Sequence, residues 1–284
     1  MTFPFLTQKS GLPDLFRQRR RPIGSLLPSN ERDPPCYSEL SSLWRYRLLE
    51  TRFLIAVFEF VLLLFSLSVH ECAHAWMASR LGDQTARLEG RVTLNPMYHV
   101  DPIGTLLFPG LIIFGPFVGF TFFSGFLVGW AKPTPVITRN FRKIVRDDNL
   151  TTLAGPVSNV LLVIVAFSVL AAMAKTLPDG RALVQSSFIA ALSPGTPLPV
   201  HPVALLCSLA VLINLSLFFF NLLPIPPLDG SRVLRNVLPY NAVQTYDRIP
   251  IWVSYILMIF VGGFVMAALL RPALALVYFT LIHI

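Results

Sequence analysis

The sequence predicts an all-α integral membrane protein with about four to six transmembrane helices. Hydrophobic residues make up 54% of the 284 residues, and the mean hydropathy is +0.63. Charged residues make up 13%, about half the share of a typical soluble domain. Several apolar stretches also reach about 20 residues, which is the length that a helix needs to cross a bilayer. The lipid bilayer is therefore the expected environment of the chain.

Residues 1–52 are predicted to form a polar, basic tail. Nine of the 23 Lys and Arg residues lie in it, including the run Arg19-Arg20-Arg21. The residues after this run are too polar for the core of a signal peptide. We expect a flexible or surface-lying extension that ends in a short helix near residues 41–50. A membrane-embedded domain follows over residues 53–284.

The first predicted span covers residues 53–81. A helix of this length is about 43 Å long, which exceeds the ~30 Å hydrocarbon core of a bilayer. Gly82 supplies a signal for its end. The polar connection 83–101 follows. The next stretch, 102–130, is apolar but interrupted by many glycines and prolines, which predicts a re-entrant or hairpin segment rather than one plain helix.

Three more spans are predicted at residues 151–174, 200–223 and 250–270. The last stretch, residues 272–284, is apolar but only about half as long as a span. Basic residues gather in the loops 132–146 and 232–248 between these runs. The sequence therefore predicts four complete spans and one or two partial ones.

The high isoelectric point, about 9.8, does not indicate a nucleic-acid partner. The basic residues lie in the tail and between hydrophobic runs, where they normally mark cytoplasmic loops. No basic helix interleaved with aromatic residues is present, so we expect no nucleic-acid binding. The three cysteines, Cys36, Cys72 and Cys207, are too few and too far apart to indicate a disulfide framework.

Residues 70–74 read His70-Glu71-Cys72-Ala73-His74, which is an H-E-x-x-H motif. On a helix, positions i and i+4 share one face, so both imidazoles can bind one Zn²⁺ ion. Glu71 is rotated away from that face and lies beside the metal. There it can take a proton from a zinc-bound water and pass it to a leaving amine. Ionisable side chains inside a membrane are rare and usually functional, which favours this interpretation.

A catalytic zinc site normally has three protein ligands and one open position, so one ligand is still missing. Glu59 precedes His70 by eleven residues, about 16 Å along the helix, and is too far away. Asp229 is preferred, because the three prolines before it must unwind the end of a helix at the depth of the two histidines. The candidates weighed were Glu59, His99, Asp101, His201 and Asp229.

Together these motifs resemble the site-2 protease family of intramembrane zinc metalloproteases. The family also carries N-x-x-P-x-x-x-x-D-G on a later membrane helix, which is matched here by Asn221, Pro224, Asp229 and Gly230. The resemblance covers roughly residues 68–240 and is greatest to the compact bacterial branch, because no PDZ or CBS domain is recognisable. Three further stretches match that branch: Gly90–Gly104, Gly129–Val136 and Ala154–Asn159.

By this resemblance, one Zn²⁺ ion would be bound by His70, His74 and Asp229, with Glu71 as the base. Asn221 would orient the substrate or stabilise the tetrahedral oxyanion. Asn159 and His99 are further candidates for roles near the site. Asn159 is expected to form interhelical hydrogen bonds there, and a capping or surface role for His99 stays equally open.

The expected activity is hydrolysis of peptide bonds in or near transmembrane segments of membrane-anchored protein substrates, in the manner of regulated intramembrane proteolysis. The alternative is a zinc-binding membrane scaffold or transporter without protease activity. A transporter should show repeated halves with paired broken helices, which are not found. A degenerate scaffold should have lost Glu71 or a ligand, and none is lost.

The expected location is a bacterial plasma membrane, with the active site toward the cytoplasm. His70 and Asp229 lie near the C-terminal ends of their helices, so these ends must face the same side. The basic loops next to them suggest the cytoplasmic side. The basic N-terminal tail conflicts with this orientation. An additional re-entrant piece near residues 40–60 is one way to reconcile the two signals.

Overall fold

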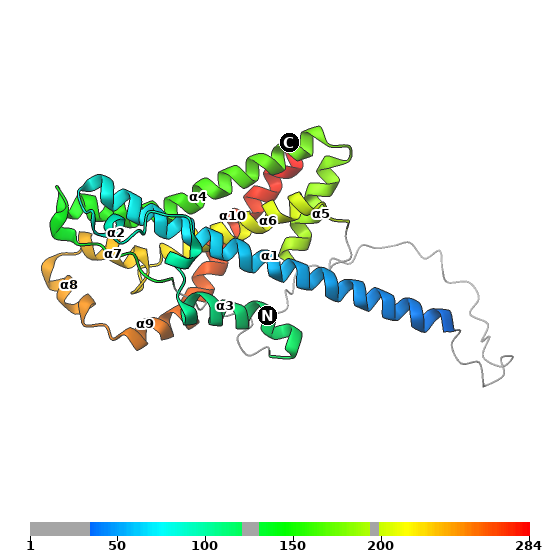
Figure 1. Cartoon of the computed structure of the whole chain (residues 1–284), viewed down its shortest axis with the longest axis horizontal. Helices are drawn as coiled ribbons and strands as arrows, with labels where there is room; N and C mark the ends of the chain where they lie inside the picture. Colours follow the sequence, from blue (N-terminus) through cyan, green and yellow to red (C-terminus); the bar gives the residue numbers. More distant parts are fainter. Residues whose placement is uncertain (1–34, 121–130, 194–198) are drawn as a thin grey trace, which may run out of the picture. The chain divides into compact units, whose positions relative to one another are not determined.

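A computed structural model describes residues 35–120, 131–193 and 199–284. Every regular element in these ranges is helical, which confirms the predicted all-α class (Figure 1). Four helical segments are long and apolar enough to cross a membrane. They cover Arg52–Leu81, Ile144–Thr176, Pro202–Asn221 and Gly263–His283. The expected number of four to six spans is therefore met at its lower end.

The first helix, α1, covers Pro35–Leu81 and carries the H-E-x-x-H motif. It ends where the sequence predicts, immediately before Gly82. It also includes the short helix expected near residues 41–50. The re-entrant piece suggested near residues 40–60 is wrong, because α1 is continuous through this region. The rest of the predicted tail, residues 1–34, lies outside the described residues.

The connection after α1 is built from short helical pieces. The stretch Pro102–Val118 consists of a π-helical turn (Pro102–Leu107), α3 (Phe108–Phe114) and a 3₁₀ turn (Gly115–Val118). At 1.5 Å per residue it is about 25 Å long, which is too short for a full span. Part of the predicted re-entrant or hairpin segment, residues 121–130, lies outside the described residues. The remaining pieces are α2 (Thr85–Leu88) and two 3₁₀ turns, Pro96–Tyr98 and Thr138–Asn140.

The centre of the domain is formed by α4 (Ile144–Thr176), α5 (Gly180–Leu192) and α6 (Pro202–Asn221). The predicted span 151–174 lies within α4, and α6 covers all but the two residues at each end of the predicted span 200–223. The sequence analysis missed α5, because its 13 residues are too few to register as a span. Its Phe188 is buried with Leu170 of α4 and Val211 of α6 in the main apolar core.

The C-terminal part differs from the prediction. A span at residues 250–270 followed by a separate half-span was expected. The structure instead has α9 (Ile251–Leu257), a π-helical turn (Met258–Gly262) and α10 (Gly263–His283). The predicted boundary between the span and the half-span, near Pro272, lies inside α10. Proline is tolerated inside membrane helices, because neighbouring groups satisfy the freed carbonyl. Two further short helices, α7 (Asp229–Val237) and α8 (Tyr240–Asp247), lie within the predicted basic loop.

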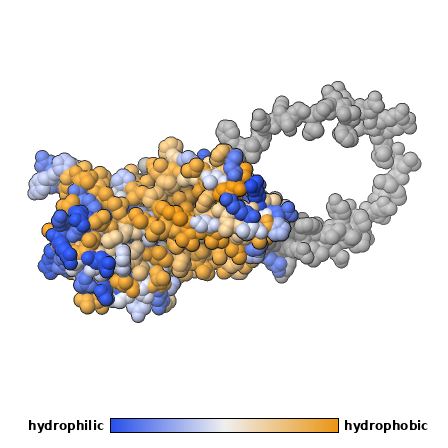
Figure 2. Space-filling view, turned by 90° about the horizontal axis from the view of Figure 1, so that it is seen from above, coloured by the Kyte–Doolittle hydropathy of each residue, from blue (hydrophilic) through white to orange (hydrophobic). Residues whose placement is uncertain are grey.

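The helices α1 and α6 bring their C-terminal ends together with the N-terminal part of α4. Side-chain contacts of His70 with Asp229 and of His74 with Thr151 join these ends. Hydrophobic side chains cover the middle of the domain, and hydrophilic ones gather at the end where α7 and α8 lie (Figure 2). This end carries both predicted motifs.

Candidate metal centre and active site

The two histidines of α1 point their Nε2 atoms at one another. These atoms are 3.0 Å apart, and the side chains are buried. The four-residue spacing places one imidazole a helical turn above the other on the same face. Two nitrogen donors therefore converge on one point inside the protein.

Asp229 brings a carboxylate oxygen to the same point. Its Oδ2 lies 3.1 Å from Nε2 of His70 and 3.4 Å from Nε2 of His74. Gly230 lets the chain fold back tightly here, since a Cβ atom at this position would lie 2.2 Å from the carbonyl oxygen of Leu222. The structure thus places the Asp-Gly pair where the sequence analysis expected the third ligand.

The hydrogen bond at the other ring nitrogen sets the tautomer of His74. Its Nδ1 lies 2.8 Å from the backbone carbonyl oxygen of Thr151 on α4. A carbonyl can only accept, so Nδ1 carries the hydrogen and Nε2 keeps its lone pair. Nε2 of His74 is therefore ready to bind a cation.

Asn159 of α4 supports the other imidazole. Its side-chain amide is fully buried and lies 3.3 Å from Nδ1 of His70. The amide oxygen and nitrogen of Asn exchange places when the group is turned over. With Oδ1 toward the ring, it accepts from Nδ1–H and leaves Nε2 of His70 free to bind a metal. The interhelical hydrogen bond expected for Asn159 is thus present.

Gly155 lies directly against both imidazoles. A Cβ atom at this position would lie 2.4 Å from Nε2 of His74 and 2.6 Å from Nε2 of His70. Any larger residue would therefore occupy the space around the ligand atoms. Only glycine allows α4 to approach the site this closely.

The donor set fits a zinc ion. Ligand atoms at 2.0–2.1 Å on the corners of a tetrahedron lie about 3.3 Å apart. The observed separations between the three donor atoms are 3.0, 3.1 and 3.4 Å. The Asp229 carboxylate thus completes a set of two nitrogen donors and one oxygen donor, which are ligand types that zinc accepts.

Glu71 is the second carboxylate near the two histidines. Its ligand atom and those of His70 and His74 lie within 4.8 Å of one another. Its Oε2 accepts hydrogen bonds from the hydroxyl group (2.8 Å) and the backbone N–H (3.2 Å) of Thr134. The Asp229 carboxylate is closer to both imidazoles than Glu71 is, and it accepts no hydrogen bond from Thr134. The geometry therefore favours Asp229 as the third ligand and leaves Glu71 beside the metal.

Polar contacts hold α7 against α4 and so fix the position of Asp229. Arg232 donates to Oδ1 of Asp148 at 2.9 Å, and the Asn236 amide donates to Oδ2 of the same carboxylate at 2.7 Å. Asp148 is buried in the first turns of α4. This arrangement ties the helix that begins at Asp229 to the helix that carries Gly155.

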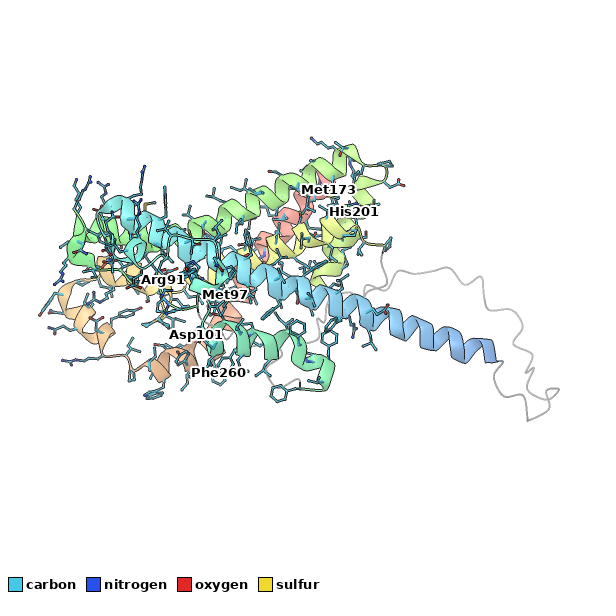
Figure 3. The ribbon with its side chains drawn as sticks, viewed as in Figure 1. Arg91, Met97, Asp101, Met173, His201 and Phe260 are labelled. Atoms are coloured by element: carbon cyan, nitrogen blue, oxygen red, sulfur yellow. The ribbon has the colours of Figure 1, made fainter. Side chains whose placement is uncertain are left out.

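The other candidate ligands have different roles. Asp101 accepts from the backbone N–H groups of Ile103 and Gly104 and caps the helical stretch after it. His201 is the N-cap residue of α6, and in Figure 3 it appears away from Arg91 and Asp101. Some 20 residues of helix, about 30 Å, separate it from the end of α6 near Asp229.

His99 and Asn221 are not brought into the donor set. His99 is buried, and its Nε2 lies 2.8 Å from the backbone carbonyl of Thr93. The Asn221 amide donates to the carbonyl of Leu217 on its own helix at 2.9 Å. The residues that the sequence analysis missed are Thr151, Gly155 and Thr134. Gly155 is a fixed position of the matched stretch Ala154–Asn159, so its signal was present without an assigned role. Thr134 lies in Gly129–Val136 at a position that the family pattern leaves open, so this stretch gave no signal for its side chain.

Comparison with known proteins agrees with this site. The model of peptidase family M50 matches residues 58–264. The chain is 37% identical over 179 residues to "Putative zinc metalloprotease YwhC" of Bacillus subtilis, covering 63% of this chain and 68% of that protein. It is 27% identical over 220 residues to "Putative zinc metalloprotease Rip2" of Mycolicibacterium smegmatis, covering 78% and 69%.

A protein with the same name from Mycobacterium tuberculosis is 30% identical over 174 residues, which cover 61% of this chain and 54% of that protein. No solved structure gives a significant match. The family match includes both motifs and most of the described helices. With four apolar helices and a site that fits zinc, the chain belongs to peptidase family M50, the site-2 protease family, and is a zinc metalloprotease of the membrane.

Proposed function

We propose that this protein hydrolyses peptide bonds in or near the transmembrane segments of membrane-anchored substrate proteins. The observation that carries the proposal is the convergence of His70, His74 and Asp229 inside a bundle of membrane-length helices. A site at this depth can act on a bond that a membrane anchor brings to it. Cleavage of such anchors would serve regulated intramembrane proteolysis.

In the proposed mechanism, His70, His74 and Asp229 would hold a zinc ion through their Nε2 and Oδ2 atoms. A zinc ion held there would supply Lewis-acid chemistry for the scissile carbonyl and would make a water molecule more acidic. Glu71 accepts the proton of the attacking water and then donates it to the leaving amine. Asn159 and the Thr151 carbonyl hold the two imidazoles in the tautomer that binds metal.

Asn221 is the proposed contact for the substrate or the oxyanion. Its amide donates to the carbonyl of Leu217, so it must turn toward the substrate to act in this way. His99 is better explained by a supporting role. Its ring contacts the carbonyl of Thr93, and its own carbonyl accepts from the backbone N–H of Lys132 at 2.9 Å.

The site is proposed to open toward the cytoplasm of a bacterial cell. The loops at the site end carry five basic residues between positions 131 and 146 and three between positions 232 and 248. The described residues of the loop between α4 and α6 contain Arg181 as their one basic side chain. Positive charge gathers on the cytoplasmic side of membrane proteins, which favours this orientation.

The Glu71→Gln variant tests the proposal. The purified enzyme is reconstituted with a panel of fluorescently labelled single-span reporter proteins, and cleavage is followed with and without a zinc chelator. The variant should keep its zinc but lose cleavage by at least about 10²-fold, because it lacks a proton acceptor. Full activity in this variant, or no chelator-sensitive cleavage of any reporter by the wild type, would refute the proposal.

A further inference from the structure

Residues 131–137 form an irregular segment that passes beside the active site and is called the strap here. Hydrogen bonds from its backbone N–H groups attach the strap to the rest of the protein near each of its two ends. The backbone N–H of Lys132 donates to the carbonyl of His99 at 2.9 Å. The backbone N–H of Ile137 donates to Oδ2 of Asp83 at 2.7 Å, just beyond the end of α1. The strap is therefore attached near both of its ends to earlier parts of the chain.

Thr134, at the centre of the strap, contacts Glu71 of α1. Its hydroxyl group lies 2.8 Å from Oε2 of Glu71 and 3.2 Å from the backbone carbonyl oxygen of the same residue. Its backbone N–H donates to Oε2 at 3.2 Å. Three polar contacts thus join one residue of the strap to one residue of α1.

The neighbours of Thr134 restrict its backbone. Pro133 fixes its own φ, and Pro135 keeps the residue before it out of the helical region. The two prolines thereby restrict the direction of the Thr134 N–H, so little backbone entropy is lost when it binds Glu71. The two prolines thus account for the direction of the Thr134 N–H, while the hydroxyl group comes from a position that the family pattern leaves open.

We propose that Thr134 is a positioning residue that orients the carboxylate of Glu71 for proton transfer. Both hydrogen bonds to the carboxylate fall on Oε2, which leaves Oε1 as the proton-accepting atom. No hydrogen bond to Oε1 is found within the described part of the chain. The inference rests on the proposed function, because it takes Glu71 as the base. It adds that the strap, through Thr134, sets the rate of the chemical step.

Substitution of the hydroxyl group tests this role. Thr134→Val keeps the size of the side chain and the backbone N–H but removes the hydroxyl, while Thr134→Ser keeps all three contacts. Thr134→Val should lower kcat on a cleaved single-span reporter by roughly tenfold or more, with KM and zinc content unchanged, because a hydrogen bond to a charged acceptor is lost. Thr134→Ser should restore most of kcat. Thr138→Val is the matched control on the next turn and should resemble the wild type.

Amide hydrogen exchange tests the contact without any substrate. Glu71→Ala in the full-length, zinc-loaded protein should accelerate exchange of the Thr134 amide, while the amides of Lys132 and Ile137 keep their protection. The two prolines lack an N–H, so few other amides contribute signal in this peptide. Unchanged exchange at Thr134, or a Thr134→Val enzyme as fast as the wild type, overturns the inference.

The two tests separate the inference from the proposed function. If Glu71→Gln is inactive and Thr134→Val is fully active, the proposed function is supported and the role of Thr134 is refuted. If Glu71→Gln is fully active, both the assignment of Glu71 as the base and the role of Thr134 are refuted.

Discussion

The side chains proposed as zinc ligands are held in place by neighbouring groups that are not themselves among the proposed ligands. All of these groups belong to α4: the Thr151 carbonyl and the Asn159 amide contact the imidazoles, and Gly155 leaves room for them because it has no side chain. Partners of this kind fix the ring orientation and the basicity of histidine ligands, and losing one typically costs 10- to 100-fold in metal affinity or activity. We therefore propose that the stretch Ala154–Asn159 supports the metal site, although it donates no ligand.

Gly155→Ala should abolish zinc binding. The added methyl group would lie 2.4–2.6 Å from the imidazole nitrogens, so the rings must move away from the positions that bind metal. Gly263→Ala is the matched control, because a Cβ atom there meets no atom within 4 Å. Metal analysis of the two purified variants should find zinc lost, by at least tenfold, in the first variant only. Normal zinc content in Gly155→Ala would show that α4 does not approach the ligands as described.

At the scale of elements, Asp83 attaches the strap to the end of α1. This fully buried carboxylate accepts from the backbone N–H groups of Thr85 and Ile137 and from the side chains of Thr85 and Asn140. Burial would raise the pKa of Asp83, but these hydrogen bonds outweigh it and lower the pKa below the ordinary value of 3.8. Asp83 in its charged form therefore stabilises the folded state.

This stabilisation should depend on pH in a defined direction. Because the folded pKa is the lower one, the contribution is fully present above about pH 5 and is lost as the pH falls below about 4. Asp83→Asn should lower the Tm in detergent by roughly 3–8 °C at pH 7, since two oxygens that accept hydrogen bonds become one. The difference from the wild type should shrink below pH 4.

Asp247→Asn is the control for this measurement. Asp247 pairs with Arg235 on an exposed surface, so its loss should change the Tm little at any pH. A difference for Asp83→Asn that grows on acidification would contradict the described role of Asp83.

The sequence predicted the catalytic elements better than the supporting ones. The shared face of His70 and His74 follows from helical periodicity. Asp229 was preferred among several candidate third ligands because prolines precede it, and the family resemblance points to the same residue. The roles of Gly155 and Thr134 did not follow, because they depend on how closely α4 and the strap approach α1. Such approaches are tertiary distances, and periodicity along one segment carries no information about them.

The same reasoning explains the errors in the fold. Pro272 looks like the end of a helix by local propensity, but α10 continues through it to His283. The helix α5 is too short to be recognised by hydropathy, yet Phe188 places it in the main core. In both cases packing against neighbouring helices decided the outcome.

At the scale of the whole molecule, the hydrophilic surface near α7 and α8 lies at the same end as the metal centre (Figure 2). Basic residues of the described loops are concentrated at this end. Such a distribution predicts that the loop before α4 and the loop after it lie on opposite sides of the bilayer, with the first in the cytoplasm.

Cysteine labelling tests this orientation. Arg142→Cys and Pro178→Cys are introduced separately after Cys36, Cys72 and Cys207 have been replaced by alanine. A membrane-impermeant maleimide should label Pro178→Cys in intact bacterial cells, and Arg142→Cys only after the membrane is opened. Both positions are exposed, so burial does not limit the reaction. The reverse pattern would place the active site on the outer side.

The central claim is that His70, His74 and Asp229 bind the zinc ion while Glu71 does not. Metal analysis of purified Asp229→Ala and Glu71→Gln proteins tests it most directly, because these are the two carboxylates next to the imidazoles. We predict about one zinc per chain in Glu71→Gln and at most about a tenth of that in Asp229→Ala. Zinc retained in Asp229→Ala and lost in Glu71→Gln would contradict the account.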